Sequence, residues 1–190
     1  REQAFLATHD PLTGLSNRIL LNDRLEHAIE HAKRFDKHIG LIFCDLDNFK
    51  PINDTCGHTV GDEILKRVSF YLKDLFRKED TVCRFGGDEF VILIEELEDF
   101  QYLDSILKRI NQLTTTPCVI NGNAITIGMS IGASIFPYDG TDSDRLIEAA
   151  DQAMYRAKRS GKNCIEYSQT NTQWYQLDNR PGNETFNYMI

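Results

Sequence analysis

The stretch RFGGDEFVIL, residues 84–93, places two glycines and two acids inside a run that is otherwise apolar. The apolar residues at 90–93 favour burial in a hydrophobic core. The glycine pair at 86–87 predicts a two-residue hairpin turn, because such turns use the positive φ angles that glycine adopts without strain. We therefore expect a β-hairpin with Asp88 and Glu89 at its mouth, where a turn alone requires no pair of carboxylates.

Helical and strand patterns alternate on both sides of this hairpin. Apolar residues at helical spacing predict helices over 19–35, 60–76, 100–113 and 143–160. Apolar runs and a turn signal predict strands at 38–47, 81–85, 89–95 and 124–136, a hairpin turn at 121–123, and a last strand from Asn163. This order predicts an α/β (α+β) domain, with a central mostly antiparallel or mixed sheet flanked by helices.

The composition is that of a globular domain, and 190 residues are enough to form one hydrophobic core. A formal net charge of −8 argues against binding to nucleic acid or to a membrane surface, both of which call for a basic field. No apolar run approaches the roughly 18 residues of a membrane span, so we expect no membrane insertion. The five scattered cysteines favour a reduced, cytoplasmic environment.

The two ends of the chain differ from the middle. Residues 1–8 look like the end of a linker helix that continues from a preceding region, and we assign residues 9–168 to the domain. Residues 169–190 are polar and rich in turn residues, and they receive no assignment. The domain would thus suit the cytoplasmic output end of a larger protein, membrane-bound or not.

Four acids follow or open predicted strands. Asp45 and Asp47 stand at the end of strand 38–47, and Asp88 and Glu89 open the next one after the turn. If the two strands are neighbours, three or four carboxylates converge at one edge of the sheet and raise each other's pKa. Mg²⁺ removes this conflict, because it takes oxygen ligands and keeps phosphates and waters. Either pair alone is more simply a solvated strand end, but both pairs together favour a metal site.

The segment LDNFKPINDTCGH, residues 46–58, is typical of a strand-to-helix turn. Backbone N–H groups of Asn48 and Phe49 at the start of a helix can hold phosphate. Lys50 adds a positive charge beside them.

Polar residues further along suit a nucleotide base and its phosphates. Asn53, His58 and Asp62 follow the turn, and an aspartate can accept two N–H bonds from the Watson–Crick edge of guanine. Taken alone, Asn53 and Asp62 are a helix cap and a helix N-terminal charge. Lys158 and Lys162 lie about one helical turn apart at the end of the last helix, where they either face phosphate or complement the helix dipole.

Four separated motifs resemble the GGDEF-domain diguanylate cyclases. They are HDPLTGLSNR (9–18), DLDNFKPINDTCGHTVGD (45–62), RFGGDEF (84–90) and AADQAMYRAKRSGKN (149–163). The resemblance covers about residues 9–167. It implies a palm-like nucleotide-cyclase fold and the synthesis of cyclic di-GMP from two GTP with release of two pyrophosphates.

The resemblance also implies roles for individual residues. Mg²⁺ (or Mn²⁺) would be held by Asp45, the backbone carbonyl of Leu46, Asp88 and Glu89. Asp88 would accept the proton, with Glu89 assisting and Lys50 stabilising the transition state. Guanosine would be bound by Asn53, His58 and Asp62, and the phosphates by Asn48, Phe49, Lys50, Lys158 and Lys162.

The segment RKED, residues 77–80, is by itself a charged helix end. Many GGDEF-domain cyclases carry an R-x-x-D site that binds inhibitory product at this same distance before the first glycine of the motif. Arg77 and Asp80 match this site. The resemblance thus implies inhibition by cyclic di-GMP, with a further basic contact from Lys108 or Arg109.

Each chain carries one set of guanine-reading residues, yet the implied product joins two GTP molecules, so we expect a homodimer. Two departures from the family pattern are small: Cys56 stands where an aromatic residue is common, and Lys162 where arginine is frequent. The alternative is a catalytically silent module that binds GTP or cyclic di-GMP and regulates a partner domain. The presence of Asp45, Asp88 and Glu89 favours the enzyme.

Overall fold

The computed structural model of the chain describes residues 5–168. The helices are α2 (Arg18–Phe35), α3 (Phe49–Cys56), α4 (His58–Leu75), α5 (Phe100–Thr115) and α6 (Ser143–Arg159). The strands are β1 (His38–Leu46), β2 (Thr81–Gly86), β3 (Glu89–Leu97), β4 (Cys118–Ile120), β5 (Asn123–Ile125), β6 (Met129–Phe136) and β7 (Ile165–Tyr167). The tail left unassigned from the sequence, 169–190, lies outside the described residues.

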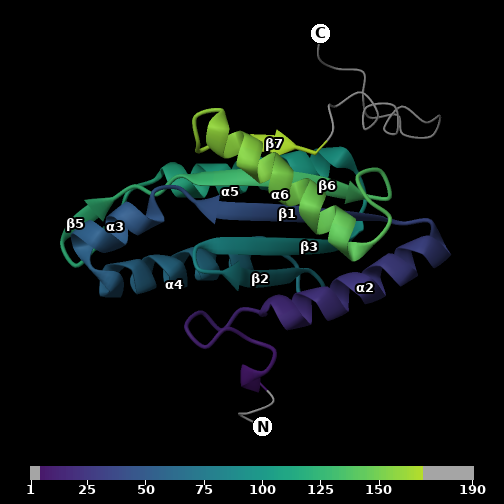
Figure 1. Ribbon diagram of the computed structural model, residues 1–190, viewed down its shortest axis with the longest axis horizontal. Helices are drawn as coiled ribbons and strands as arrows, with labels where there is room; N and C mark the ends of the chain where they lie inside the picture. The colour runs from purple at the N-terminus through teal and green to yellow at the C-terminus, as the bar shows by residue number, and fades with distance from the viewer. Residues whose placement is uncertain (1–4, 169–190) are drawn as a thin grey trace.

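Five strands form the central sheet in the order β2-β3-β1-β6-β7 (Figure 1). β1 pairs antiparallel with both β3 and β6, β2 pairs antiparallel with β3, and β7 lies parallel to β6. This confirms the predicted mixed sheet with helices on its faces. The short strands β4 and β5 form a separate hairpin, whose turn residues Asn121 and Gly122 have φ angles of 49° and 80°.

Helices cover both faces of this sheet. α2 and α6 share one hydrophobic cluster with Leu41 and Phe43 of β1. α4 and α5 share another with the alternate residues Ile42 and Cys44. Both faces of β1 are therefore buried, which explains why this strand has a continuous apolar sequence rather than an alternating one. Within residues 5–168, no helix combines the length and apolar character needed to cross a bilayer.

The turn between β2 and β3 differs from the sequence prediction. β2 continues through Gly86, which pairs with Glu89, so the two turn residues are Gly87 and Asp88. Neither Gly86 nor Gly87 is among the residues with positive φ, so that expectation was wrong. A Cβ on Gly87 would meet no atom within 4 Å, so the second glycine leaves open space above the turn.

The predicted strand at 124–136 is also divided in two. β5 ends at Ile125 and β6 begins at Met129. The intervening Gly128 is constrained at the end of β1, because a Cβ there would lie 2.9 Å from an oxygen of Asp47. Between the two strands the chain therefore passes close to Asp47, a contact that no apolar pattern encodes.

Sheet and helix pack closely at Gly132 in β6. A Cβ at this position would collide with the backbone of Ala150 and Met154 in α6. We predict that Gly132→Ala lowers the free energy of unfolding by about 1–3 kcal/mol, the usual cost of overpacking. Urea denaturation tests this against Gly40→Ala in β1, where the nearest atom, on Ile94, would lie at 3.5 Å in ordinary contact. Equal midpoints for the two variants would contradict it.

Candidate active site

The β2–β3 turn lies against the carboxyl end of β1. Asp45 faces Glu89 in the register of β1 and β3, and the backbone N–H of Leu46 donates to the carbonyl oxygen of Asp88 over 3.2 Å. The four residues predicted to hold a metal, Asp45, Leu46, Asp88 and Glu89, therefore lie together at one edge of the sheet. The pairing of β1 with β3 is what brings Asp45 close to Asp88 and Glu89.

Asp45 is a buried carboxylate with a lysine partner. It is 5% exposed, and its Oδ2 lies 2.8 Å from Nζ of Lys158 in α6. Burial raises the pKa of Asp45 to about 6, with the charges of Asp88 and Glu89 adding to the rise while Lys158 opposes it. Burial also raises the pKa of Glu89, with contributions from Asp151 and Asp88. Negative charge at this edge exceeds what the lysine neutralises.

This surplus of buried negative charge fits a hard cation, and carboxylate and carbonyl oxygens are the ligands that Mg²⁺ prefers. Within residues 5–168, however, no three acidic, histidine or cysteine side chains are arranged as a ready metal site. Lys158 lies against Asp45 instead, and its ammonium group provides the positive charge that a metal ion would bring. Metal binding through Oδ2 of Asp45 would require this side chain to move.

Asp47 does not take part in the acidic group. β1 ends at Leu46, and Asp47 then accepts hydrogen bonds from the Ser130 hydroxyl (2.6 Å) and the Asn163 backbone N–H (2.7 Å). Both carboxylate oxygens are occupied in this way. Of the three or four acids expected to converge, Asp45, Asp88 and Glu89 do so, and Asp47 instead fixes the loop after α6.

That loop brings a second lysine to the start of α3. Asn48 precedes α3 in the left-handed conformation (φ 59°), and its side-chain oxygen accepts a 2.7 Å hydrogen bond from Nζ of Lys162. Phe49 and Lys50 form the first turn of α3, where Lys50 is exposed. Four of the residues predicted to contact phosphate thus gather around one helix N-terminus, a favourable place for an anion, whereas the fifth, Lys158, lies against Asp45.

The predicted base-binding residues lie where α3 meets α4. A Cβ on Gly61 would collide with the Asn53 side-chain oxygen, so the glycine allows this close approach. The same oxygen is buried and has no hydrogen-bond partner among the described residues. Buried polar atoms are normally paired, so this acceptor is suited to a ligand donor. His58 and Asp62 are exposed on the first turns of α4.

Arg77 and Asp80 lie together after α4, as the R-x-x-D match requires. The Arg77 backbone N–H donates to Asp80 Oδ2 over 3.1 Å, and its guanidinium lies 4.9 Å from the centre of the Tyr102 ring. Both residues line a cavity of about 260 Å³. Arg24 and Lys73 also line it, so the cavity is basic.

Sequence reasoning missed the residue that holds the turn. Arg84 donates from Nε and Nη2 to the carbonyl oxygen of Gly87, at 3.0 and 2.8 Å, and pairs with Asp10 at 3.1 Å. The side chains of Arg84 and Asp10 are 16% and 18% exposed. Both residues stand in motifs quoted above, but they lie 74 positions apart and no local pattern links them.

We predict that Asp45→Asn raises the free energy of unfolding of the metal-free protein at pH 7 by about 1–3 kcal/mol. The folded pKa of about 6 lies above the ordinary value, so ionisation of Asp45 opposes folding. The gain should vanish below about pH 4, where this carboxyl is protonated in both states. Urea denaturation across this pH range, with the exposed Asp54→Asn as control, tests the expectation. A gain that is independent of pH would contradict it.

Comparison with known proteins agrees with this arrangement. The family model described as diguanylate cyclase, GGDEF domain, matches residues 7–164. The bifunctional diguanylate cyclase/cyclic di-GMP phosphodiesterase MucR of Pseudomonas aeruginosa is 44% identical over 166 residues, which cover 86% of this chain and 24% of MucR. Diguanylate cyclase DosC of Escherichia coli is 40% identical over 158 residues, which cover 83% of this chain and 34% of DosC. The chain thus spans about a quarter of the length of MucR and about a third of the length of DosC.

A solved structure shows the same fold. The coiled coil and GGDEF domain of DgcB from Caulobacter crescentus, in complex with c-di-GMP, matches with a TM-score of 0.76 at 27% identity. The match covers 87% of this chain and 88% of that one. Together with the family match over most of the sequence, this confirms the resemblance stated from the motifs: the chain belongs to the GGDEF-domain family of diguanylate cyclases.

Proposed function

We propose that this chain condenses two GTP molecules into cyclic di-GMP, with Mg²⁺ (or Mn²⁺) as cofactor. The observation that carries the proposal is the position of Asp88 and Glu89 beside the buried Asp45, within a group of acids that one lysine does not neutralise. The names of DosC and MucR, both of which include diguanylate cyclase, support it.

The reaction joins the 3′-oxygen of one GTP to the α-phosphorus of another and breaks the bond to pyrophosphate. Asp88 accepts the proton of the 3′-hydroxyl, assisted by Glu89. Bound Mg²⁺ would be held by Asp45, the Leu46 carbonyl and Asp88, and it would supply charge neutralisation at the attacked phosphate. Lys158 leaves Asp45 and binds phosphate oxygens instead, so the lysine exchanges one anionic partner for another.

The remaining site residues orient the nucleotide. N–H groups at Asn48 and Phe49, together with Lys50 and Lys162, hold the phosphates, with Lys50 at the charge that develops in the transition state. The unpaired oxygen of Asn53 and the carboxylate of Asp62 select guanine through its N–H donors, with His58 beside them.

The product contains two guanosine units, whereas each chain offers one such set of residues. We therefore propose that two copies face each other in C2 symmetry during the reaction.

We predict that incubation with GTP and Mg²⁺ yields cyclic di-GMP and two pyrophosphates, as separated by anion-exchange chromatography. Asp88→Asn, which keeps the shape of the turn residue, should lower the rate by at least about 100-fold, because the proton acceptor is lost. Circular dichroism and the unfolding midpoint of this variant control for folding. If the wild type binds GTP but forms no product, the chain is instead a catalytically silent module that regulates a partner domain.

Regulation by product is the second part of the proposal. Arg77 and Asp80 line a basic cavity away from the acidic edge, and the DgcB structure contains c-di-GMP. The guanidinium of Arg77 can bind phosphate or a guanine edge with two hydrogen bonds, and Asp80 can accept from guanine N–H groups. Cyclic di-GMP bound here would restrain the domain without occupying the GTP site.

We predict that cyclic di-GMP inhibits the reaction non-competitively with GTP, and that Arg77→Ala weakens this inhibition at least about tenfold while the uninhibited rate is preserved. Initial rates over a grid of GTP and product concentrations test this. The exposed Lys78→Ala on the same cavity serves as the control for loss of charge. Purely competitive inhibition, or unchanged inhibition in Arg77→Ala, would exclude the assignment.

A further inference from the structure

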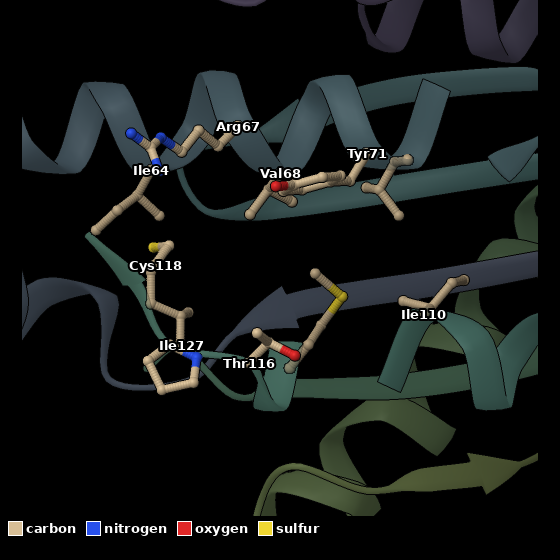
Figure 2. A pocket seen from close by; sticks show the side chains of 11 residues that line it. Ile64, Arg67, Val68, Tyr71, Ile110, Thr116, Cys118 and Ile127 are labelled. Atoms are coloured by element: carbon tan, nitrogen blue, oxygen red, sulfur yellow. The ribbon is translucent and has the colours of Figure 1, made fainter. Parts of the chain in front are cut away.

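A cavity of about 190 Å³ lies between α4 and the β4–β5 hairpin region, apart from the site residues described above. Figure 2 shows Ile64, Val68 and Tyr71 of α4 facing Cys118 and Ile127 across it. The walls are mainly apolar, and Leu72, Ile110 and Met129 complete the inner side. These three residues are at most 2% exposed, so the cavity reaches into the hydrophobic core.

One cation borders this apolar space. Arg67 lines the cavity and is exposed, and its guanidinium makes no hydrogen bond or ion pair with any residue in the described range 5–168. Glu63, one helical turn earlier, accepts a 2.9 Å hydrogen bond from Lys66, which is the main cause that lowers the Glu63 pKa, and the charge of Arg67 adds a smaller contribution from a distance. In Figure 2 the Arg67 side chain runs along α4 toward Ile64. An unpaired guanidinium beside an apolar cavity is suited to an anion with an apolar body.

The size of the cavity limits the ligand. An apolar protein cavity of roughly 150 Å³ is known to accept benzene. The present volume of about 190 Å³ therefore accommodates one aromatic ring. A carboxylate attached by a short link would then reach the guanidinium at the rim, where two parallel hydrogen bonds can form.

We propose that this cavity binds a small aromatic carboxylate, with the ring among Ile64, Ile127 and Met129 and the carboxylate on Arg67. The proposal does not depend on the cyclase reaction. A ligand in this cavity would nevertheless lie next to the proposed GTP site. Met129 pairs with Leu46 across β6 and β1, and Ile64 follows Asp62 by two residues on α4.

A second copy of the chain is the other occupant to consider. Tyr71 and the neighbouring Val119 are 46% and 61% exposed, so this surface has some apolar character outside the cavity. The cavity is concave and Arg67 stands at its rim, and these two features favour a small anion as the occupant over the flatter surface of a second copy. The experiment below distinguishes the two occupants.

The probes are phenylacetate and its neutral analogue phenylacetamide, titrated into the full chain with ¹³C-labelled isoleucine and methionine methyl groups. We expect saturable shifts of the methyl signals of Ile64, Ile110, Ile127 and Met129. Phenylacetate should bind at least about tenfold more tightly than phenylacetamide, because only the carboxylate forms a charge-assisted pair with arginine.

Two variants of equal charge provide the comparison. Arg67→Gln should abolish the preference for phenylacetate while both probes still shift the same methyl signals. Arg34→Gln, which removes an exposed charge from α2, should leave the preference intact.

Three results would overturn the proposal. They are the absence of saturable shifts at these methyl groups, equal affinity of the wild type for the two probes, and a preference that Arg67→Gln retains. Methyl shifts that change with protein concentration when no probe is present would assign the surface to contact between copies and would also overturn it.

Discussion

The antiparallel pairing of β1 with β3 sets Asp45 opposite Glu89, and the other contacts of the site lie around this register. A shift by one residue would turn every side chain of β1 to the other face of the sheet. Because both faces of β1 are packed against helices, such a shift would disrupt two hydrophobic clusters at once. The core therefore fixes the register, and the register brings the acids together.

The position of these acids has a cost in stability. A carboxylate that is 5% exposed beside two further acids is harder to ionise, as the raised pKa of Asp45 shows. Lys158 offsets part of this cost, and the hydrogen bonds of Arg84 to Gly87 and Asp10 hold the turn against the remaining repulsion. Strained electrostatics of this kind is expected where a protein prepares a site for a cation.

Much of this could be predicted from the sequence because the signals are local. Helical periodicity located the four long helices, and the acids at the end of β1 and after the glycines indicated the acidic edge of the sheet. The turn predicted at Gly86 and Gly87 lies one residue later because Gly86 pairs with Glu89, and neither glycine has the positive φ that was expected. The Arg84–Asp10 pair and the contact of Asp47 with Asn163 were missed because tertiary packing brings these residues together across 74 and 116 positions of the chain.

The most direct test of the account is a crystal structure of the chain with Mg²⁺ and a GTP analogue that has a non-hydrolysable bond between the α- and β-phosphates. We expect a metal ion bound by Asp45, the Leu46 carbonyl and Asp88. We also expect that Lys158 has moved from Asp45 to a phosphate oxygen, and that the guanine lies between Asn53 and Asp62. A nucleotide bound elsewhere, with Lys158 still paired to Asp45, would contradict it.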